Sequence, residues 1–196
     1  MGPRLPAPLR RRQLLEVAIT VFARRGYANA SMNDVADAAG VTKPVLYQHF
    51  RSKHDLYLAA LDDVGDRLRR HVEQSTVDLD SPRDQVVAGL TAYFRFVADH
   101  GDAFELLFGD GTRRDPDLHR AARAVEDAVG RSVGELIAVS NLADRDRELL
   151  GHAIVGMAEG ACRFWLAEEP RRDPAQLAAR IAQLAWAGLR GVGSEA

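Results

Sequence analysis

The 196-residue sequence contains one cysteine, Cys162, and no apolar run long enough to cross a membrane. A single cysteine excludes a disulfide within the chain and a metal site built from several thiolates, so a reducing compartment is the simplest expectation. A membrane-spanning helix needs about 20 consecutive apolar residues. The start of the sequence has charge and proline but no apolar stretch, unlike a secretion signal. We therefore expect a cytoplasmic protein with no membrane partner.

The sequence also lacks the patterns that most enzymes and metal proteins carry. Its six histidines share no ligand spacing. Gly109-Asp110-Gly111 has neither a preceding strand nor the Lys-Ser/Thr pair of a phosphate-binding loop. Cys162 lies in an apolar helical context that is typical of a core thiol. We therefore predict no catalytic residues, no metal and no cofactor, and an enzyme is a disfavoured alternative.

Charge is distributed unevenly along the chain, although the formal net charge is only −2. Residues 1–57 hold nine Lys and Arg against four Asp and Glu, a net charge of +5, and the remaining residues hold 17 against 24, a net charge of −7. With 46% hydrophobic residues the chain can bury a sizeable core. A basic segment joined to a larger acidic one fits a nucleic-acid-binding module attached to a domain with another task.

Residues 31–56 predict two short helices joined by a tight turn, followed by the start of a third helix. Ser31 and Asp34 form a capping-box pattern that begins the first helix. Gly40 stands where a left-handed residue ends that helix. Thr42 is a good N-cap for the second helix. The arrangement is a helix-turn-helix.

On a helical wheel of residues 43–50, Leu46 and Phe50 fall together on one side and are expected to face the core. The remaining sides carry Lys43, Pro44, Val45, Tyr47, Gln48 and His49. Cationic, amide, phenol and imidazole groups are those that contact DNA, so this surface is predicted to face a groove. A further cap pattern, with Lys53 in its first turn, begins the next helix at an end suited to phosphate.

Three motifs in this segment resemble those of the tetracycline-repressor (TetR) family of bacterial transcription regulators. They are Ala39-Gly40-Val41 in the turn, Leu46-Tyr47-x-His49-Phe50 in the second helix, and Ser52-Lys53-x-x-Leu56 after it. The similarity covers residues 9–58. At positions 44 and 45 the family often has Gly-Thr or a similar pair of a small residue and a hydroxyl residue. This chain has Pro44-Val45 there, so position 45 offers no hydroxyl group for a DNA contact. The resemblance implies DNA contacts from Ser31, Thr42, Lys43, Pro44, Val45, Tyr47, Gln48, His49 and Lys53.

The rest of the sequence predicts helices and no strands, because apolar residues recur at helical spacing between caps, prolines and glycines. The expected fold is all-α, with about nine helices. We expect a disordered arm at 1–8, a three-helix DNA-binding domain at 9–52, and a helical ligand-binding and dimerisation domain at 53–196. A long helix over 53–74 links the two domains. The arginine triplet 10–12 fits a basic arm in a minor groove as well as a solvated helix start.

The last two predicted helices carry more apolar surface than one subunit can bury. On the final helix, one face holds Leu177, Ile181, Leu184 and Gly188, and the opposite face holds Ala179, Ala182 and Trp186. We predict that the two helices pair with their copies across a two-fold axis in a four-helix bundle. The residues involved include Met157, Ala161, Phe164, Ile181 and Leu184. The alternative is that the helices are buried within their own subunit.

Four of the seven phenylalanines fall within residues 94–108, next to Tyr93 and around His100. Side chains that line a pocket and those that fill a core look alike in a sequence, but the resemblance places the ligand of such regulators between helices of this middle region. We therefore predict a small, largely hydrophobic effector. Its predicted contacts are Phe94, His100, Phe104, Leu107, Phe108, His119, Arg123 and Trp165.

Together these features predict a homodimeric repressor that binds a palindromic operator in double-stranded DNA and is released by a small molecule. The recognition helices of such a dimer enter successive major grooves roughly 34–36 Å apart. A ligand that changes this distance therefore abolishes binding to both half-sites together. An architectural DNA-binding dimer without an effector is the alternative. It is disfavoured because the acidic domain is larger than dimerisation requires.

Overall fold

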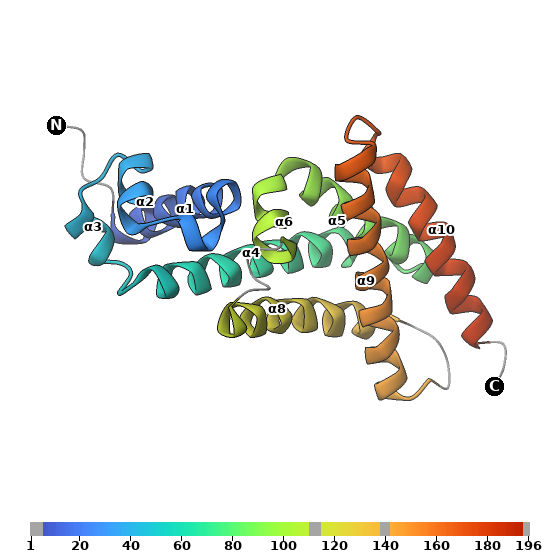
Figure 1. Ribbon diagram of the computed structural model, residues 1–196. Coiled ribbons are helices and arrows are strands. Elements are labelled where there is room, and N and C mark those ends of the chain that lie inside the picture. The colour runs from blue at the N-terminus through green and yellow to red at the C-terminus, as the bar shows by residue number, and fades with distance from the viewer. Residues whose placement is uncertain (1–5, 110–114, 138–141, 194–196) are drawn as a thin grey trace. The chain divides into compact units, whose positions relative to one another are not determined.

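The structure is a computed structural model that describes residues 6–109, 115–137 and 142–193 (Figure 1). Within these ranges the chain forms nine helices and no strand, which confirms the predicted all-α fold. The helices are α1 (Ala7–Asn29), α2 (Met32–Ala38), α3 (Lys43–Tyr47), α4 (Lys53–Thr76), α5 (Pro82–Asp99), α6 (Gly101–Phe108), α8 (Pro116–Glu135), α9 (Asp144–Glu168) and α10 (Pro174–Gly193).

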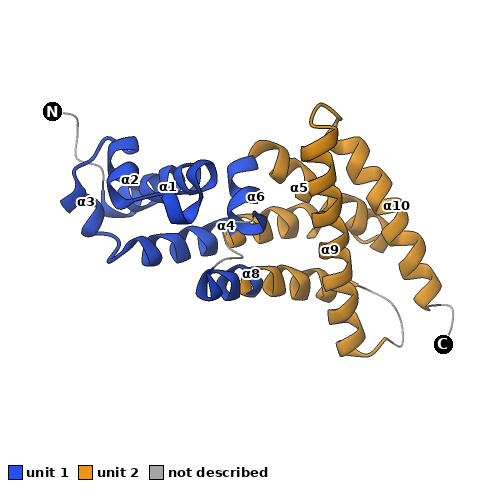
Figure 2. Cartoon of the chain, in the orientation of Figure 1, with its two compact units in different colours: residues 1–64, 101–123 blue, residues 65–100, 124–196 orange. Residues whose placement is uncertain are grey.

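The chain divides into two compact units (Figure 2). Unit 1 comprises residues 1–64 and 101–123, and unit 2 comprises residues 65–100 and 124–196. The predicted domain boundary at residue 53 is the start of α4, whereas the division between the units falls inside that helix. Most of the predicted disordered arm lies outside the described residues, but α1 already includes Ala7 and Pro8.

Local signals in the sequence determine where the first helices begin and end. The Asp34 N–H donates to the Ser31 hydroxyl at 3.2 Å, and the Ser31 N–H donates to the Asp34 carboxylate at 2.9 Å, which completes the predicted capping box. These Ser31 bonds, helped by Arg25, hold the pKa of the Asp34 carboxyl below its ordinary value. Gly26 and Gly40 have φ of 72° and 64°, a backbone conformation that a side chain would strain. They break α1 near its end and terminate α2.

Unit 1 packs α1 against α2 and α6 around an aromatic cluster. The ring of Tyr57 lies edge-on to the rings of Phe22 and Tyr27, with centroid distances of 4.9 Å in both pairs. The buried Tyr57 hydroxyl donates to the Leu106 carbonyl of α6 at 3.3 Å, and burial raises the pKa of the Tyr57 phenol. The short helix α6 is therefore attached to the same core as the helix-turn-helix.

Unit 2 packs α5 against α9 and α10, and α8 crosses α9 where three glycines meet. A Cβ on Gly151 would overlap the Gly130 carbonyl oxygen and lie 2.6 Å from the Gly134 nitrogen. A Cβ on Gly134 would lie 2.8 Å from the Arg147 carbonyl oxygen. The two backbones approach this closely because Gly134 and Gly151 have no side chain at the crossing.

We expect Gly151→Ala to lower the free energy of unfolding by about 1–3 kcal/mol, because the new methyl group forces the two backbones apart. Thermal unfolding measures the change, at roughly 2–4 °C per kcal/mol for a chain of this length. Gly89→Ala is the matched control in α5, since its Cβ would lie at an ordinary 3.6 Å from Thr76 and Val72. The control should stabilise the helix by up to about 1 kcal/mol. Equal behaviour of the two variants would contradict the close crossing.

Candidate DNA-binding face and ligand cavity

The helix-turn-helix of unit 1 leaves the predicted DNA-contacting residues exposed or half-buried, and its apolar residues are buried. Leu46 and Phe50 are buried, as the helical wheel predicts. Thr42, Lys43, Pro44, Tyr47 and Gln48 are exposed, and Val45 and His49 are half-buried. The exposed fraction of Tyr47 is 44%, and its ring lies 6.0 Å from the Lys43 ammonium. The Lys43 ammonium and the Tyr47 phenol therefore lie near each other on α3, and the Gln48 amide that follows them is exposed as well.

Two residues of the predicted set have partners inside the protein. The Ser31 hydroxyl is engaged in the capping box with Asp34. The Lys53 ammonium donates to the carbonyl oxygens of Tyr27 and Ala30 at 2.8 and 2.9 Å and lies 4.3 Å from the centroid of the Tyr27 ring. Lys53 thus ties the start of α4 to the end of α1, a structural role that the sequence did not suggest. Its phosphate contact remains a prediction.

The arginine triplet forms part of the first turns of α1. Arg10 and Arg12 bind Gln13 and Glu16 within that helix. The Arg11 guanidinium lies 4.5 Å from the centroid of the buried Phe50 ring, so it packs on the end of the recognition segment. This arrangement agrees with the solvated helix start, one of the two interpretations of the triplet.

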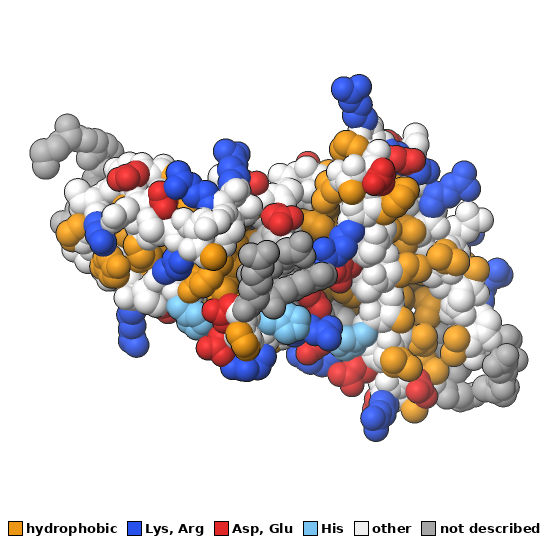
Figure 3. Space-filling view, in the orientation of Figure 1, with side chains coloured by type: hydrophobic (Ala, Val, Ile, Leu, Met, Phe, Trp, Pro, Cys, Tyr) orange, Lys and Arg blue, Asp and Glu red, His pale blue; other side chains and the backbone are white. Residues whose placement is uncertain are grey.

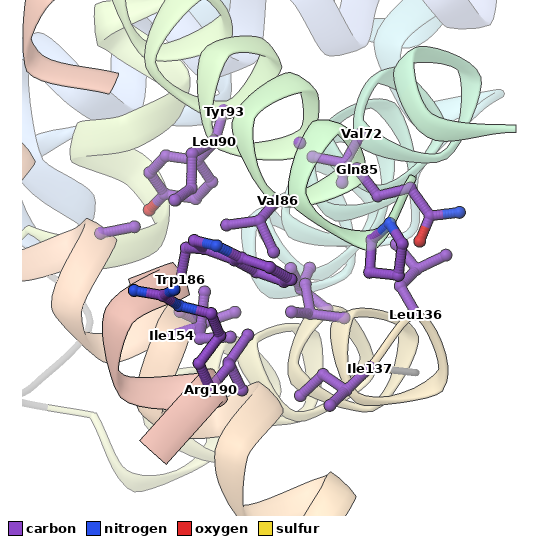
Figure 4. A pocket seen from close by; sticks show the side chains of 17 residues that line it. Val72, Gln85, Val86, Leu90, Tyr93, Leu136, Ile137, Ile154, Trp186 and Arg190 are labelled. Carbon is purple, nitrogen blue, oxygen red and sulfur yellow. The ribbon is translucent and has the colours of Figure 1, made fainter. Parts of the chain in front are cut away.

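Unit 2 contains a cavity of about 320 Å³ between α4, α5, α8, α9 and α10 (Figure 4). Its lining is mostly aliphatic, with one phenol, one indole, one carboxamide and one guanidinium group. The lining residues are Val72, Pro82, Gln85, Val86, Gly89, Leu90, Tyr93, Val129, Val133, Leu136, Ile137, Ile154, Val155, Ala158, Trp186, Leu189 and Arg190. A largely apolar cavity with a few polar groups is the usual form of a small-molecule site.

None of the eight residues predicted to bind the effector lines this cavity. Phe94 and Trp165 are buried against each other in unit 2, with ring centroids 6.3 Å apart. His100 stacks on Phe96 at 4.6 Å. The other predicted contacts belong to unit 1, where three are buried and two exposed: Phe104, Leu107 and Phe108 are buried, and His119 and Arg123 are exposed. The predicted contacts therefore lie in both units, and two of them are exposed.

The lining residues escaped prediction because their spacing is that of an ordinary buried helix face. Val86, Leu90 and Tyr93 follow one side of α5, and Val129 and Val133 follow one side of α8. Such a stripe predicts burial without saying whether the space beside it is filled. The group of aromatic residues that the sequence places around residues 94–108 included Tyr93, which lines the cavity. Tyr93 was nevertheless not among the predicted ligand contacts. Trp186, predicted on the face of the last helix opposite Leu184, lines the cavity.

The helices α9 and α10 leave an apolar stripe on the surface of unit 2, as the face in Figure 3 shows. Leu149, Phe164 and Leu184 are 65%, 59% and 60% exposed. A Cβ on Gly156, Gly160 or Gly188 would meet no atom within 4 Å. Met157, Ala161 and Ile181, from the predicted dimer set, are half-buried beside them. We call this surface the α9/α10 face. Exposed apolar patches of this kind mark protein interfaces.

The described residues offer little for other chemistry. Burial raises the pKa of the Cys162 thiol to about 12, and the nearby Glu159 adds to the shift, so the thiol stays protonated. No group of three His, Cys, Asp or Glu side chains able to hold a metal occurs within the described ranges. Among the helices described here, none is long and apolar enough to cross a membrane.

Comparison with known proteins matches both parts of the chain to models of one family. Residues 14–60 match the model of bacterial regulatory proteins of the tetR family, and residues 82–188 match the tetracyclin repressor-like C-terminal domain. The HTH-type transcriptional activator FasR of Mycolicibacterium smegmatis is 34% identical over 192 residues, which cover 97% of this chain and 88% of FasR. The repressor KstR2 of the same species is 34% identical over 116 residues, 59% of this chain and 56% of KstR2.

A solved structure resembles the whole fold. The regulator FadR from Bacillus subtilis, crystallised in complex with stearoyl-CoA, gives a TM-score of 0.76 and covers 89% of this chain and 96% of its own. Its sequence identity is 15%, so the likeness concerns the fold alone.

Proposed function

The chain belongs to the TetR family of bacterial regulatory proteins, and from that premise we propose that it is a homodimeric repressor released from a palindromic operator by an apolar small molecule. It is a ligand-responsive, DNA-binding transcription regulator, and FasR and KstR2 are named as transcription regulators too. The observation that carries the finer proposal is the apolar cavity in unit 2, because two of the helices that line it, α4 and α8, continue into the DNA-binding unit.

Two chain connections support coupling between the cavity and the helix-turn-helix. Val72 of α4 lines the cavity, and the same helix begins at Lys53 in unit 1. Tyr93 of α5 lines the cavity too, and α5 is followed directly by α6, which packs on α1 in unit 1. A ligand that changes the position of α4 or α5 therefore acts on unit 1 through the backbone itself. The free energy by which the ligand shifts the protein between its DNA-binding and its released arrangement cannot exceed the difference in its binding free energy for the two.

The effector proposed for the cavity is a molecule with a long or bulky apolar body, because aliphatic groups dominate the lining. The test first obtains an operator by in-vitro selection of bound DNA. Fluorescence anisotropy then measures how much of that operator the protein binds as stearoyl-CoA is added. That compound is named for the Bacillus subtilis FadR structure. Release by stearoyl-CoA and not by free coenzyme A is the expected result. If the operator affinity stays constant while stearoyl-CoA is bound, the result would contradict a ligand-released repressor and favour an architectural DNA-binding dimer.

Activation of transcription is the second candidate, because FasR, the relative that spans 97% of this chain, is named an activator. KstR2, matched over a shorter segment, is named a repressor. In-vitro transcription from a promoter that carries the selected operator separates the two functions. A repressor lowers the amount of transcript when it is added without ligand, and an activator raises it.

We propose that Gln48, exposed on the recognition segment, contacts a base edge. Gln48→Ala should then lose about 1–3 kcal/mol of discrimination at one position of each half-site, since a bidentate pair with adenine contributes that much. In-vitro selection with the variant is expected to return operators degenerate at that position and otherwise unchanged. Gln176→Ala, on the exposed side of α10, is the matched control. Identical sequence preferences in the wild type and Gln48→Ala would remove Gln48 from the base-reading set.

A further inference from the structure

The Lys53 ammonium at the start of α4 has three partners inside unit 1. It donates to the Tyr27 carbonyl oxygen at 2.8 Å and to the Ala30 carbonyl oxygen at 2.9 Å. The Tyr27 ring is the third partner, with its centroid 4.3 Å from the ammonium nitrogen. A lysine ammonium has three N–H donors. A DNA phosphate could therefore bind Lys53 only by displacing a partner that the protein already supplies.

The two carbonyl groups belong to the turn that leads from α1 into the helix-turn-helix. Gly26, with a φ of 72°, breaks α1 directly before Tyr27. Ala30 is 2% exposed and directly precedes Ser31, the N-cap of α2. A charged donor that holds both carbonyl groups therefore fixes where α2 begins relative to α4. Without it, two carbonyl groups lose a charge-assisted hydrogen bond, and the turn gains freedom.

The backbone at the start of α4 is occupied as well. The Asp55 N–H donates to the Ser52 hydroxyl at 3.0 Å, and the Asp55 carboxylate accepts from the Arg51 N–H at 2.8 Å. The positive end of the α4 dipole is thus neutralised by a carboxylate of the protein itself. This is the end at which the sequence suggested a phosphate.

Arg51 is an exposed cation at the end of the recognition segment, residues 43–50. It directly follows the buried Phe50, and its N–H bond to Asp55 holds its backbone in place. Its guanidinium forms no ion pair or hydrogen bond with the part of the chain that the structure describes. Lys43 is exposed at the opposite end of the segment. Cations at both ends of a segment that enters a groove are placed to meet phosphates.

We propose that Arg51 binds a DNA phosphate at the end of the recognition segment, and that Lys53 positions this segment from inside the protein instead of contacting DNA. The proposal rests on DNA binding and not on the cavity or its effector. The two roles differ in their salt dependence, because a cation that neutralises a phosphate releases a counterion and a cation held by carbonyl groups does not.

The experiment measures the affinity of the full chain for its selected operator by fluorescence anisotropy between about 50 and 200 mM salt. Arg51→Gln should reduce the slope of log affinity against log salt by about 0.9 for each copy of the chain on the DNA. Arg51→Lys should keep the slope, because lysine also binds phosphate. Arg83→Gln is the matched control, since it removes the same charge from an exposed position of unit 2. It should leave the slope unchanged.

Lys53→Met keeps the unbranched stem and removes the ammonium, and it should lower the affinity about tenfold at an unchanged slope, because DNA binding must then order the turn. Lys53→Gln should recover part of that affinity, since its neutral amide can still donate to a carbonyl oxygen. All variants are measured below their melting temperatures, which circular dichroism provides.

Two results would overturn the inference. A wild-type slope in Arg51→Gln would remove the phosphate contact from Arg51. A slope reduced in Lys53→Met as expected for Arg51→Gln would return that contact to Lys53, and a wild-type affinity of this variant would leave Lys53 without a positioning role. The proposed function fails by a different measurement, an operator affinity that does not respond to bound stearoyl-CoA.

Discussion

Leu184→Arg should convert the protein into a monomer whose affinity for a full operator is at least about 100-fold lower, while its helical content stays unchanged. Leu184 lies on the α9/α10 face and is 60% exposed in the single chain, so arginine is tolerated there unless a second copy covers it. In a dimer the cation would be buried without a partner. Operator affinity depends on the pair, because joining two half-site contacts multiplies affinity by roughly 10²–10⁴.

Gln183→Arg is the matched control for this prediction, since it adds the same charge to the neighbouring exposed position of α10. Sedimentation velocity at micromolar concentration gives the oligomeric state of each variant, and fluorescence anisotropy gives the operator affinity. The control is expected to remain dimeric and to bind the operator as the wild type does. A dimeric Leu184→Arg variant with undiminished affinity would show that the proposed interface is elsewhere.

The features that could be predicted from the sequence are those that depend on a few neighbouring residues. The capping box of Ser31 and Asp34 and the left-handed Gly40 act within one or two turns of backbone, so their pattern alone determined the helix-turn-helix. The exposed stripe with Leu184 was predictable too, because it needs only the helical period and the observation that one face remains after the other is buried. The sequence does not say what covers that stripe.

The cavity could not be predicted, because it depends on the distance between helices that are far apart in the sequence. Tyr93 and Phe94 are consecutive residues of α5, yet Tyr93 lines the cavity and Phe94 packs against Trp165. The same limitation concealed the role of Lys53, whose ammonium reaches carbonyl oxygens 23 and 26 residues earlier in the chain.

Phe104→Ala separates a pocket residue from a core residue, and we expect it to lower the free energy of unfolding by about 3–5 kcal/mol, the usual loss for a buried phenylalanine. Phe104 is 5% exposed, and its ring packs against Phe108 of the same helix with centroids 4.8 Å apart. Urea unfolding without ligand measures the loss as a lower midpoint at unchanged slope.

The matching experiment uses ligand binding, because Phe104 lies in unit 1 and the cavity lies entirely in unit 2. Below the unfolding transition, Phe104→Ala should therefore bind stearoyl-CoA as the wild type does. Val133→Ala, which shortens a side chain in the cavity wall, should alter that affinity and leave most of the stability of unit 1 intact. The opposite pattern, in which Phe104→Ala keeps its urea midpoint and loses ligand affinity, would return Phe104 to the effector site that the sequence suggested.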